Sequence, residues 1–245
     1  MQPERLSPYD WLLRQPLAPG EQVFAVFGEA SSAEPFNAWC RSSPVHAPTA
    51  LWSGTAYAEW RAVMPYVALV DVDGGFLQWV ATTTSADWGW LLVSSVPQEQ
   101  LVEHLRSLTQ VLLPDGRAVF FRFWDGRYLR SIIQCAEVDA PDLLPAVTRC
   151  LINGQGFEIG AGVQKTPRDF PWWRVPETLL EQLGEHSNMT LLNNLLQWLS
   201  EERPDVFEAF SESVLRRKVA NFLAQPGLPP APESALVAFL AAELG

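Results

Sequence analysis

The chain has 245 residues, of which 48% are hydrophobic and 18% are charged, so it can fill a packed core and is not a wholly disordered protein. Its 17 basic and 28 acidic residues give a formal net charge of −11. Because nucleic-acid binding depends largely on neutralising phosphates with Lys and Arg, this charge argues against a general DNA- or RNA-binding protein.

The first two-thirds of the chain alternate β-rich runs with amphipathic stretches, which predicts an α/β (mixed α+β) lobe with a central sheet flanked by helices. Four runs share this β-rich composition, and strands are expected at residues 23–27, 51–52, 66–72 and 88–94. Helices are expected between them. One covers residues 55–63, and two others begin at the capping-box spacings of Ser31 with Glu34 and of Ser95 with Gln98.

Residues 111–124 are typical of a β-hairpin, because the Asp115-Gly116 pair readily adopts the positive φ angles of tight turns. Asp125 then stands where it can cap a helix with an apolar stripe at residues 129–133. A further helix is predicted over residues 139–151, ended by Asn153-Gly154, followed by a glycine-rich strand with bends at 154–162.

Beyond Pro176 the leucine spacing predicts helix after helix, interrupted by a short proline-rich linker at residues 226–232. The proline-rich segment 165–176 is the expected link between lobes. The sequence therefore predicts an α/β lobe over residues 1–170 and a small all-α lobe over residues 171–245.

Three cysteines, Cys40, Cys135 and Cys150, form no close pair, which favours a reducing cytoplasm over a disulfide framework. The N-terminus has no basic segment leading into an apolar stretch, and no run of about 18 apolar residues occurs. We therefore expect a cytoplasmic protein that does not cross a membrane.

The sequence offers no recognisable catalytic constellation. Its three histidines lack metal-binding spacing, and neither the nucleophile elbow of hydrolases nor the phosphate-binding loop of NTPases occurs. We therefore predict no catalytic residue, no cofactor, no metal site and no enzymatic activity.

Candidate contact residues are sought instead among polar and aromatic side chains. His104 and Arg106 flank the apolar stripe of one helix, where partly buried, hydrogen-bonded edge residues are the more common case. Arg122 should lie half buried on its strand and need a carboxylate such as that of Asp125 or Glu103. Trp172 and Trp173 lie between prolines, where contact with a partner and core packing are equally compatible with the sequence.

Several blocks in order, W-G-W-L-L-V-S from residue 88, then H-L-R, P-D-G-R and F-R-F-W-D-G-R-Y-L, resemble a family of bacterial type VI secretion adaptors, or effector chaperones, of the DUF4123 type. Upstream, residues 51–57 and 64–67 resemble the family's "L-x-x-G-T" and "P-Y-L" segments, so the likeness runs from about residue 23 to 162. The residues that carry these blocks are Trp88, Gly89, Ser94, Leu105, Asp115, Gly116, Asp125 and Arg127. The chain has Gly126 where the family usually has proline, which would loosen the start of that helix.

The resemblance implies a cytoplasmic protein that binds a toxic effector and delivers it to the valine-glycine repeat (VgrG) spike protein with its PAAR tip, without being secreted. It implies no cofactor and no nucleic-acid or membrane partner. Contact with the effector is expected at Trp172 and Trp173, with His104, Arg106 and Arg122 as scaffold or contact residues. Two alternatives stay open: a hydrolase using Asp71, Asp73 or Asp87, and a carbohydrate-binding module with a row of coplanar exposed tryptophans.

Overall fold

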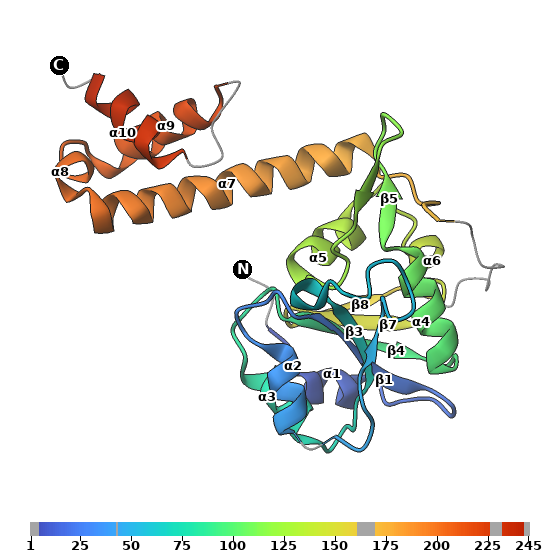
Figure 1. Cartoon of the computed structure of the whole chain (residues 1–245). Helices are drawn as coiled ribbons and strands as arrows, with labels where there is room; N and C mark the ends of the chain where they lie inside the picture. The colour runs from blue at the N-terminus through green and yellow to red at the C-terminus, as the bar shows by residue number, and fades with distance from the viewer. Residues whose placement is uncertain (1–4, 43, 161–169, 226–231, 243–245) are drawn as a thin grey trace. The chain divides into compact units, whose positions relative to one another are not determined.

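The computed structural model describes residues 5–42, 44–160, 170–225 and 232–242 (Figure 1). It divides into two compact units, residues 1–179 and residues 180–245. The predicted combination of an α/β lobe with C-terminal helices is confirmed. Residues 165–169 of the predicted link and 226–231 of the proline-rich linker lie outside the described residues.

A six-stranded sheet organises unit 1, in the order β2-β3-β1-β4-β7-β8, with antiparallel neighbours throughout that order. The strands are β1 (Gln22–Gly28), β2 (Thr49–Ala50), β3 (Pro65–Leu69), β4 (Gly89–Ser94), β7 (Arg149–Ile152) and β8 (Gln155–Glu158). The strands predicted at 23–27 and 88–94 are thereby confirmed, and the strand predicted at 66–72 exists but ends at Leu69. β1 and β4 lie inside the sheet and are buried almost throughout, which is why their sequences are continuously apolar.

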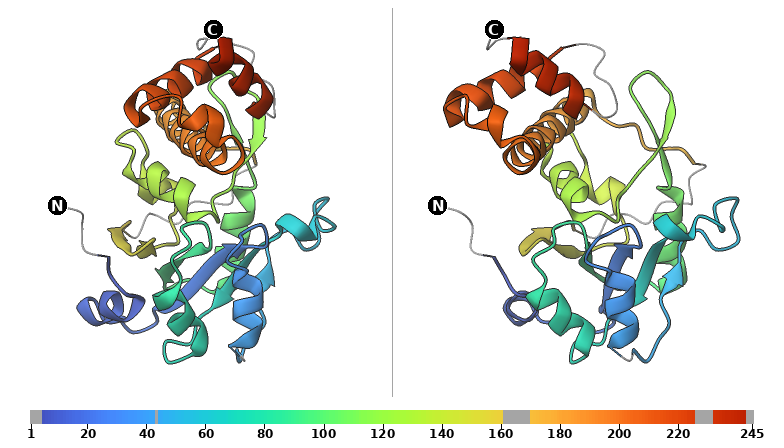
Figure 2. Two further views of the ribbon diagram at one scale, coloured as in Figure 1. Left: turned by 90° about the vertical axis from the view of Figure 1, so that its left-hand side faces the viewer. Right: turned by 60° about the vertical axis from the view of Figure 1, so that its left-hand side comes forward.

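Helices cover both faces of this sheet. Side chains of alternate residues on β1, Val23, Ala25 and Phe27, enter one core together with Trp39 and Phe76 from helices α2 and α3. The helices on this side are α1 (Pro8–Arg14), α2 (Pro35–Arg41) and α3 (Gly75–Thr82). The views of Figures 1 and 2 place α4 (Gln98–Ser107) and α5 (Gly126–Gln134) on the opposite side.

A second, small sheet is built from the predicted hairpin. β5 (Gln110–Leu112) and β6 (Ala118–Phe120) pair antiparallel, and the turn between them closes with a hydrogen bond from the Gly116 amide to the Leu113 carbonyl (2.9 Å). Gly116 has φ +85°, a conformation that glycine adopts without strain, while Asp115 does not share it. The hairpin is confirmed, with its second strand ending at Phe120 and not at residue 124.

Two predicted helices are wrong. Residues 139–151 contain the short α6 (Ala140–Leu143) and then strand β7, because Asn153-Gly154 is a hairpin turn and not a helix stop. Both turn residues have positive φ, 52° and 77°, as a two-residue hairpin turn requires. Residues 55–63 form successive turns and one 3₁₀ turn, η1 (Arg61–Val63).

Smaller differences concern boundaries and caps. The short strand expected at 51–52 lies at 49–50, and α3 was not expected at all. The helices after Ser31 and Ser95 exist, but their N-caps are Glu34 and Pro97, without side-chain caps. Asp125 does cap α5, since its carboxylate accepts a hydrogen bond from the Arg127 amide (3.0 Å).

Unit 2 is helical. Its elements are α7 (Glu177–Glu202), which begins in unit 1, α8 (Pro204–Phe207), α9 (Glu212–Leu223) and α10 (Glu233–Ala242). Leu195, Leu199, Leu215, Val219 and Leu240 are at most 2% exposed and form its core, as the leucine spacing predicts.

Candidate protein interface

Five aromatic rings from two distant segments of unit 1 meet in a cluster that we call the aromatic surface: Trp52, Tyr57, Trp60, Phe120 and Trp124. The ring of Trp52 lies at its centre, 5.5–6.2 Å between centroids from the other four. Trp52 is 2% exposed, whereas Trp60 is 46% and Phe120 is 40% exposed. The cluster thus has a buried base and two large rings open to solvent.

Tight turns bring this surface together. After β2 the chain turns twice, with hydrogen bonds from the Thr55 amide to the Trp52 carbonyl (3.1 Å) and from the Trp60 amide to the Tyr57 carbonyl (3.0 Å). Tyr57 then lies 5.3 Å from Trp60 and 5.1 Å from Phe120, between ring centroids. A loop of the large sheet and an exposed strand of the small sheet therefore share one surface.

Helix α4 and Thr109, two residues beyond its end, hold the base of the aromatic surface. The Trp52 indole donates to the hydroxyl of Thr109 (3.1 Å), and the Arg106 guanidinium donates to the Leu51 carbonyl (2.6 Å). His104 meets the Leu143 carbonyl through Nε2 (2.8 Å), and Leu105 between them is fully buried. The contacts of His104 and Arg106 are thus those of partly buried scaffold residues.

Asp125 is the centre of a polar network beside the aromatic surface. Its carboxylate is fully buried, and it receives hydrogen bonds from the Arg127 guanidinium (2.8 and 3.1 Å) and from Arg122 (3.2 Å). Both arginine side chains stay 45–47% exposed and lie against the ring of Tyr128, each 5.7 Å from its centroid. The expected pairing of Arg122 with Asp125 is confirmed.

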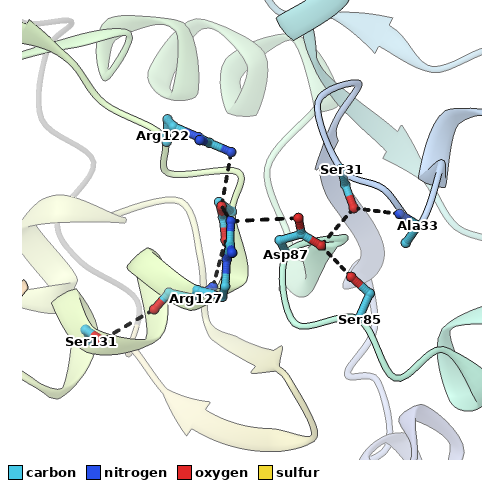
Figure 3. A network of polar contacts seen from close by, with 8 residues as sticks. Ser31, Ala33, Ser85, Asp87, Arg122, Arg127 and Ser131 are labelled. Carbon is cyan, nitrogen blue, oxygen red and sulfur yellow. Dashed lines mark hydrogen bonds and ion pairs between the residues drawn. The ribbon is translucent and has the colours of Figure 1, made fainter. Parts of the chain in front are cut away.

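Arg127 also links this network to Asp87, on the loop before β4 (Figure 3). The Arg127 guanidinium lies 3.7 Å from the Asp87 carboxylate, which also accepts hydrogen bonds from Ser31 (2.9 Å) and Ser85. Burial alone would raise the pKa of Asp87, but the bonds from Ser85 and Ser31 and the charge of Arg127 outweigh it and hold that pKa below its ordinary value. Ser31, expected to cap α2, is used here instead.

Trp172 and Trp173 lie along the small sheet in unit 1. The Leu112 amide donates to the Trp173 carbonyl (2.8 Å) and the Val175 amide donates to the Leu112 carbonyl (2.8 Å), so this segment lies parallel to β5. The Trp173 ring stacks on Phe121, with centroids 5.4 Å apart, and the Trp172 indole donates to Ser107 (3.0 Å). Both side chains are half-buried with partners inside the chain.

The other residues of the sequence blocks that resemble the adaptor family have structural roles. Trp88 packs edge-on against both Phe76 and Trp79, Ser94 donates to the Ala146 carbonyl (2.6 Å), and Asp115 accepts from the Arg117 amide (3.0 Å). A Cβ at Gly89 would collide with the Val26 carbonyl oxygen of the neighbouring strand.

Glycine at position 126 also has a physical reason. A Cβ there would lie 2.7 Å from the Gly89 carbonyl oxygen, so the start of α5 approaches β4 more closely than a side chain permits. Asp125 still caps the helix without the usual proline.

Sequence reasoning missed Tyr57, Trp60 and Phe120 as surface residues. The expected helix over 55–63 would have distributed its aromatic residues around a helix axis. Gly54, which has φ +74°, was a local sign of a turn at that point. The contact between Trp52 and Trp124 joins residues far apart in the sequence, and no local pattern indicates it.

Of the acidic residues of the hydrolase alternative, Asp71 accepts a hydrogen bond from the Asp73 amide (3.1 Å), whereas Asp87 belongs to the separate network with Ser31, Ser85 and Arg127. A cavity of about 390 Å³ beside α2 and α3 is lined by Asp71 together with Trp39, His46 and Phe76, among others. Asp73 and Asp87 are not among its lining residues in the part of the chain that the structure describes. Two exposed rings of the aromatic surface, Trp60 and Phe120, are tilted by 39° and do not form a coplanar row.

Within the described ranges, no group of three or more His, Cys, Asp or Glu side chains is arranged to hold a metal ion. Over the same residues, no helix combines the length and apolar character needed to span a bilayer.

No match to this chain was found among the curated proteins or among the solved structures. The family model described as a domain of unknown function, DUF4123, matches residues 23–140, the segment that contains the whole aromatic surface together with Asp87, Asp125 and Arg127.

Proposed function

We propose that this chain is a type VI secretion adaptor, which binds a cognate toxic effector in the cytoplasm and passes it to the VgrG spike with its PAAR tip, without itself being secreted. The proposal rests on the ordered sequence blocks and on the match of residues 23–140 to the DUF4123 family model. The structural observation that carries it is the aromatic surface, which that segment presents to solvent.

The aromatic surface has the composition of a protein-binding site. Trp, Tyr and Arg are the residues most enriched where binding energy concentrates. Here Trp60 and Phe120 are 46% and 40% exposed, and Arg122, two residues after Phe120 in the chain, is 45% exposed. Covering the exposed 46% of Trp60 would remove roughly 100 Å² from water, which corresponds to about 2–3 kcal/mol of binding free energy. A few such contacts suit a complex that must hold its cargo and later release it.

The test is capture of the toxin encoded beside this chain's gene. Tagged wild-type protein should retain the full-length toxin, and the double variant Trp60→Ala/Phe120→Ala should weaken binding by about 30-fold or more, from the area lost. The variant Trp172→Ala/Trp173→Ala tests the second aromatic pair. Its in-chain contacts predict loss of stability along with any loss of binding.

A matched control removes exposed apolar side chains elsewhere. Tyr9 and Leu13 of α1 are 43% and 79% exposed, so Tyr9→Ala/Leu13→Ala deletes similar surface away from the aromatic surface and should bind as the wild type does. Equal losses in this control and in Trp60→Ala/Phe120→Ala would remove the aromatic surface from the interface. A wild-type chain that retains no neighbouring toxin would overturn the adaptor function itself.

A further inference from the structure

One edge of the small sheet presents unpaired backbone groups. On β6 the groups that face β5 belong to alternate residues: Arg117 accepts from the Leu113 amide (2.8 Å), Val119 pairs with Val111, and Phe121 donates to the Thr109 carbonyl (3.0 Å). The amides and carbonyls of Ala118 and Phe120 therefore point outward. They have no hydrogen-bond partner among the described residues, and both residues are exposed.

The opposite edge of the same sheet is already occupied. The outward amide and carbonyl of Leu112 on β5 pair with Trp173 and Val175, which form a third, parallel strand segment. The small sheet thus extends by strand addition on one side and stops at open backbone on the other. An extended chain beside β6 would complete the outward hydrogen bonds of Ala118 and Phe120.

The side chains along this edge indicate what kind of chain fits. The Phe120 side chain is 40% exposed and lies 5.1 Å from the Trp60 ring, between centroids, so an apolar residue of an added strand would have two rings to pack on. From residue 117 to residue 130 the chain carries four arginines against one aspartate, in a protein of net charge −11. That aspartate is the buried Asp125, which Arg122 contacts at 3.2 Å, and Arg117 pairs with Asp115 just before the segment (2.7 Å). The side chains of Arg117 and Arg122 nevertheless stay 75% and 45% exposed.

We propose that the outer edge of β6 binds an extended acidic segment of the effector as an added β-strand, with its apolar residues on Trp60 and Phe120 and its carboxylates toward the arginines of residues 117–130. This inference rests on the proposed adaptor function and names the chemistry of the partner segment. Backbone hydrogen bonds would provide a general grip, and the alternation of acidic with apolar side chains would select the cargo.

Proline at position 118 tests the strand addition directly. Ala118→Pro removes an outward amide that no bond inside the described chain uses, and proline is tolerated at a sheet edge. We expect it to weaken binding of the neighbouring toxin about tenfold or more, because an acceptor on the added strand is left without its donor. Ala118→Val is the matched control, since it keeps the amide and suits a strand; it should bind within about threefold of the wild type. Far-UV circular dichroism and thermal melting check that both variants are folded.

Hydrogen exchange gives a second readout that does not depend on the toxin. The probes are a decapeptide alternating Glu with Val and its counterpart alternating Lys with Val, each added to the full wild-type chain. The acidic peptide should slow exchange at the amides of Ala118 and Phe120 and leave the already bonded Val119 amide unchanged, and the basic peptide should slow neither.

The outcomes separate the two proposals. If the toxin binds the wild type and Ala118→Pro equally well, strand addition at β6 is overturned while the adaptor function stands. If the acidic peptide protects Ala118 and Phe120 but no neighbouring toxin binds, the binding edge stands and the adaptor function fails. Equal protection by both peptides overturns the charge selection.

Discussion

Replacing Asp125 with alanine would remove the N-cap of α5 and both arginine contacts at once. Loss of the cap costs about 1 kcal/mol of folding free energy, and loss of the charge-assisted bonds from Arg122 and Arg127 costs about 1.5–3 kcal/mol. The two guanidinium groups are 45–47% exposed and would regain water, so no buried charge is stranded. We therefore expect Asp125→Ala to lower the free energy of unfolding of unit 1 by about 2.5–4 kcal/mol.

Urea unfolding followed by tryptophan fluorescence measures this loss. Trp198 is the one tryptophan of residues 180–245, so most of the 11 tryptophans report on unit 1. Asp125→Asn keeps a good capping side chain but loses the charge, and should cost about half as much as the alanine variant. Asp115→Ala breaks an ion pair whose side chains are 75% and 52% exposed, so the midpoint of unfolding should stay almost where it is in the wild type.

Comparing Asp125→Ala, Asp125→Asn and Asp115→Ala shows whether Asp125 holds the polar network together. The midpoint should fall while the denaturant slope stays constant, as for a loss of stability without a change in the surface exposed on unfolding. A cost for Asp125→Ala no larger than that for Asp115→Ala would refute the role of Asp125 as the centre of the network. Equal costs for the alanine and asparagine variants would instead assign the whole effect to lost charge.

Three further predictions concern Gly89 at the start of β4, the carboxylate of Asp87, and the cysteines Cys40 and Cys150. Gly89→Ala should lower the melting temperature by several degrees and the free energy of unfolding by more than about 2 kcal/mol. Gly116→Ala, also at positive φ but with no atom within 4 Å of its new Cβ, should lower that free energy by about 1 kcal/mol. Equal losses in calorimetry would contradict the steric account. The pKa of Asp87 is lowered in the folded chain, so this carboxylate stabilises the fold at pH values above its ordinary pKa of 3.8, and that contribution is lost as the pH falls through the lower folded pKa. Asp87→Asn should therefore lose stability less steeply than the wild type when both are titrated with acid. An unchanged profile would argue against the network. Burial raises the pKa of the Cys150 thiol far above its usual range, whereas Cys40 is exposed. Mass spectrometry after brief iodoacetamide treatment should therefore find Cys40 alkylated and Cys150 unmodified. Alkylation of Cys150 in the native protein would contradict this prediction.

Local patterns predicted the parts of this fold that local interactions decide. The apolar runs of β1 and β4 predict buried strands, and the position of Asp125 predicts both the N-cap of α5 and the ion pair with Arg122. Asn153-Gly154 was misread because the same pair can end a helix or close a hairpin, and pairing with a distant strand, β4, settled the choice.

The aromatic surface could not be predicted in the same way. It depends on Trp52 meeting Trp124 across a long stretch of chain and on the turn geometry of residues 52–60, which no periodicity signals. Helix α3 was not predicted because it begins with two glycines, Gly74 at its N-cap and Gly75 at its first position, a pair that is more typical of a turn. For Trp172 and Trp173, the pairing of their segment with β5 could be seen only once the hairpin was in place.

The edges of the six-stranded sheet offer few free backbone groups to which a strand of another chain could hydrogen-bond. Its margin at β2 is two residues long, and β8 at the other margin has four residues, with the charged Glu158 among them and the Leu6 amide bonded to the carbonyl of Gly154 at its turn. Short or charged margins of this kind discourage chains from polymerising through their sheets. The margins of the six-stranded sheet therefore leave little free backbone for edge-to-edge pairing between copies of this chain.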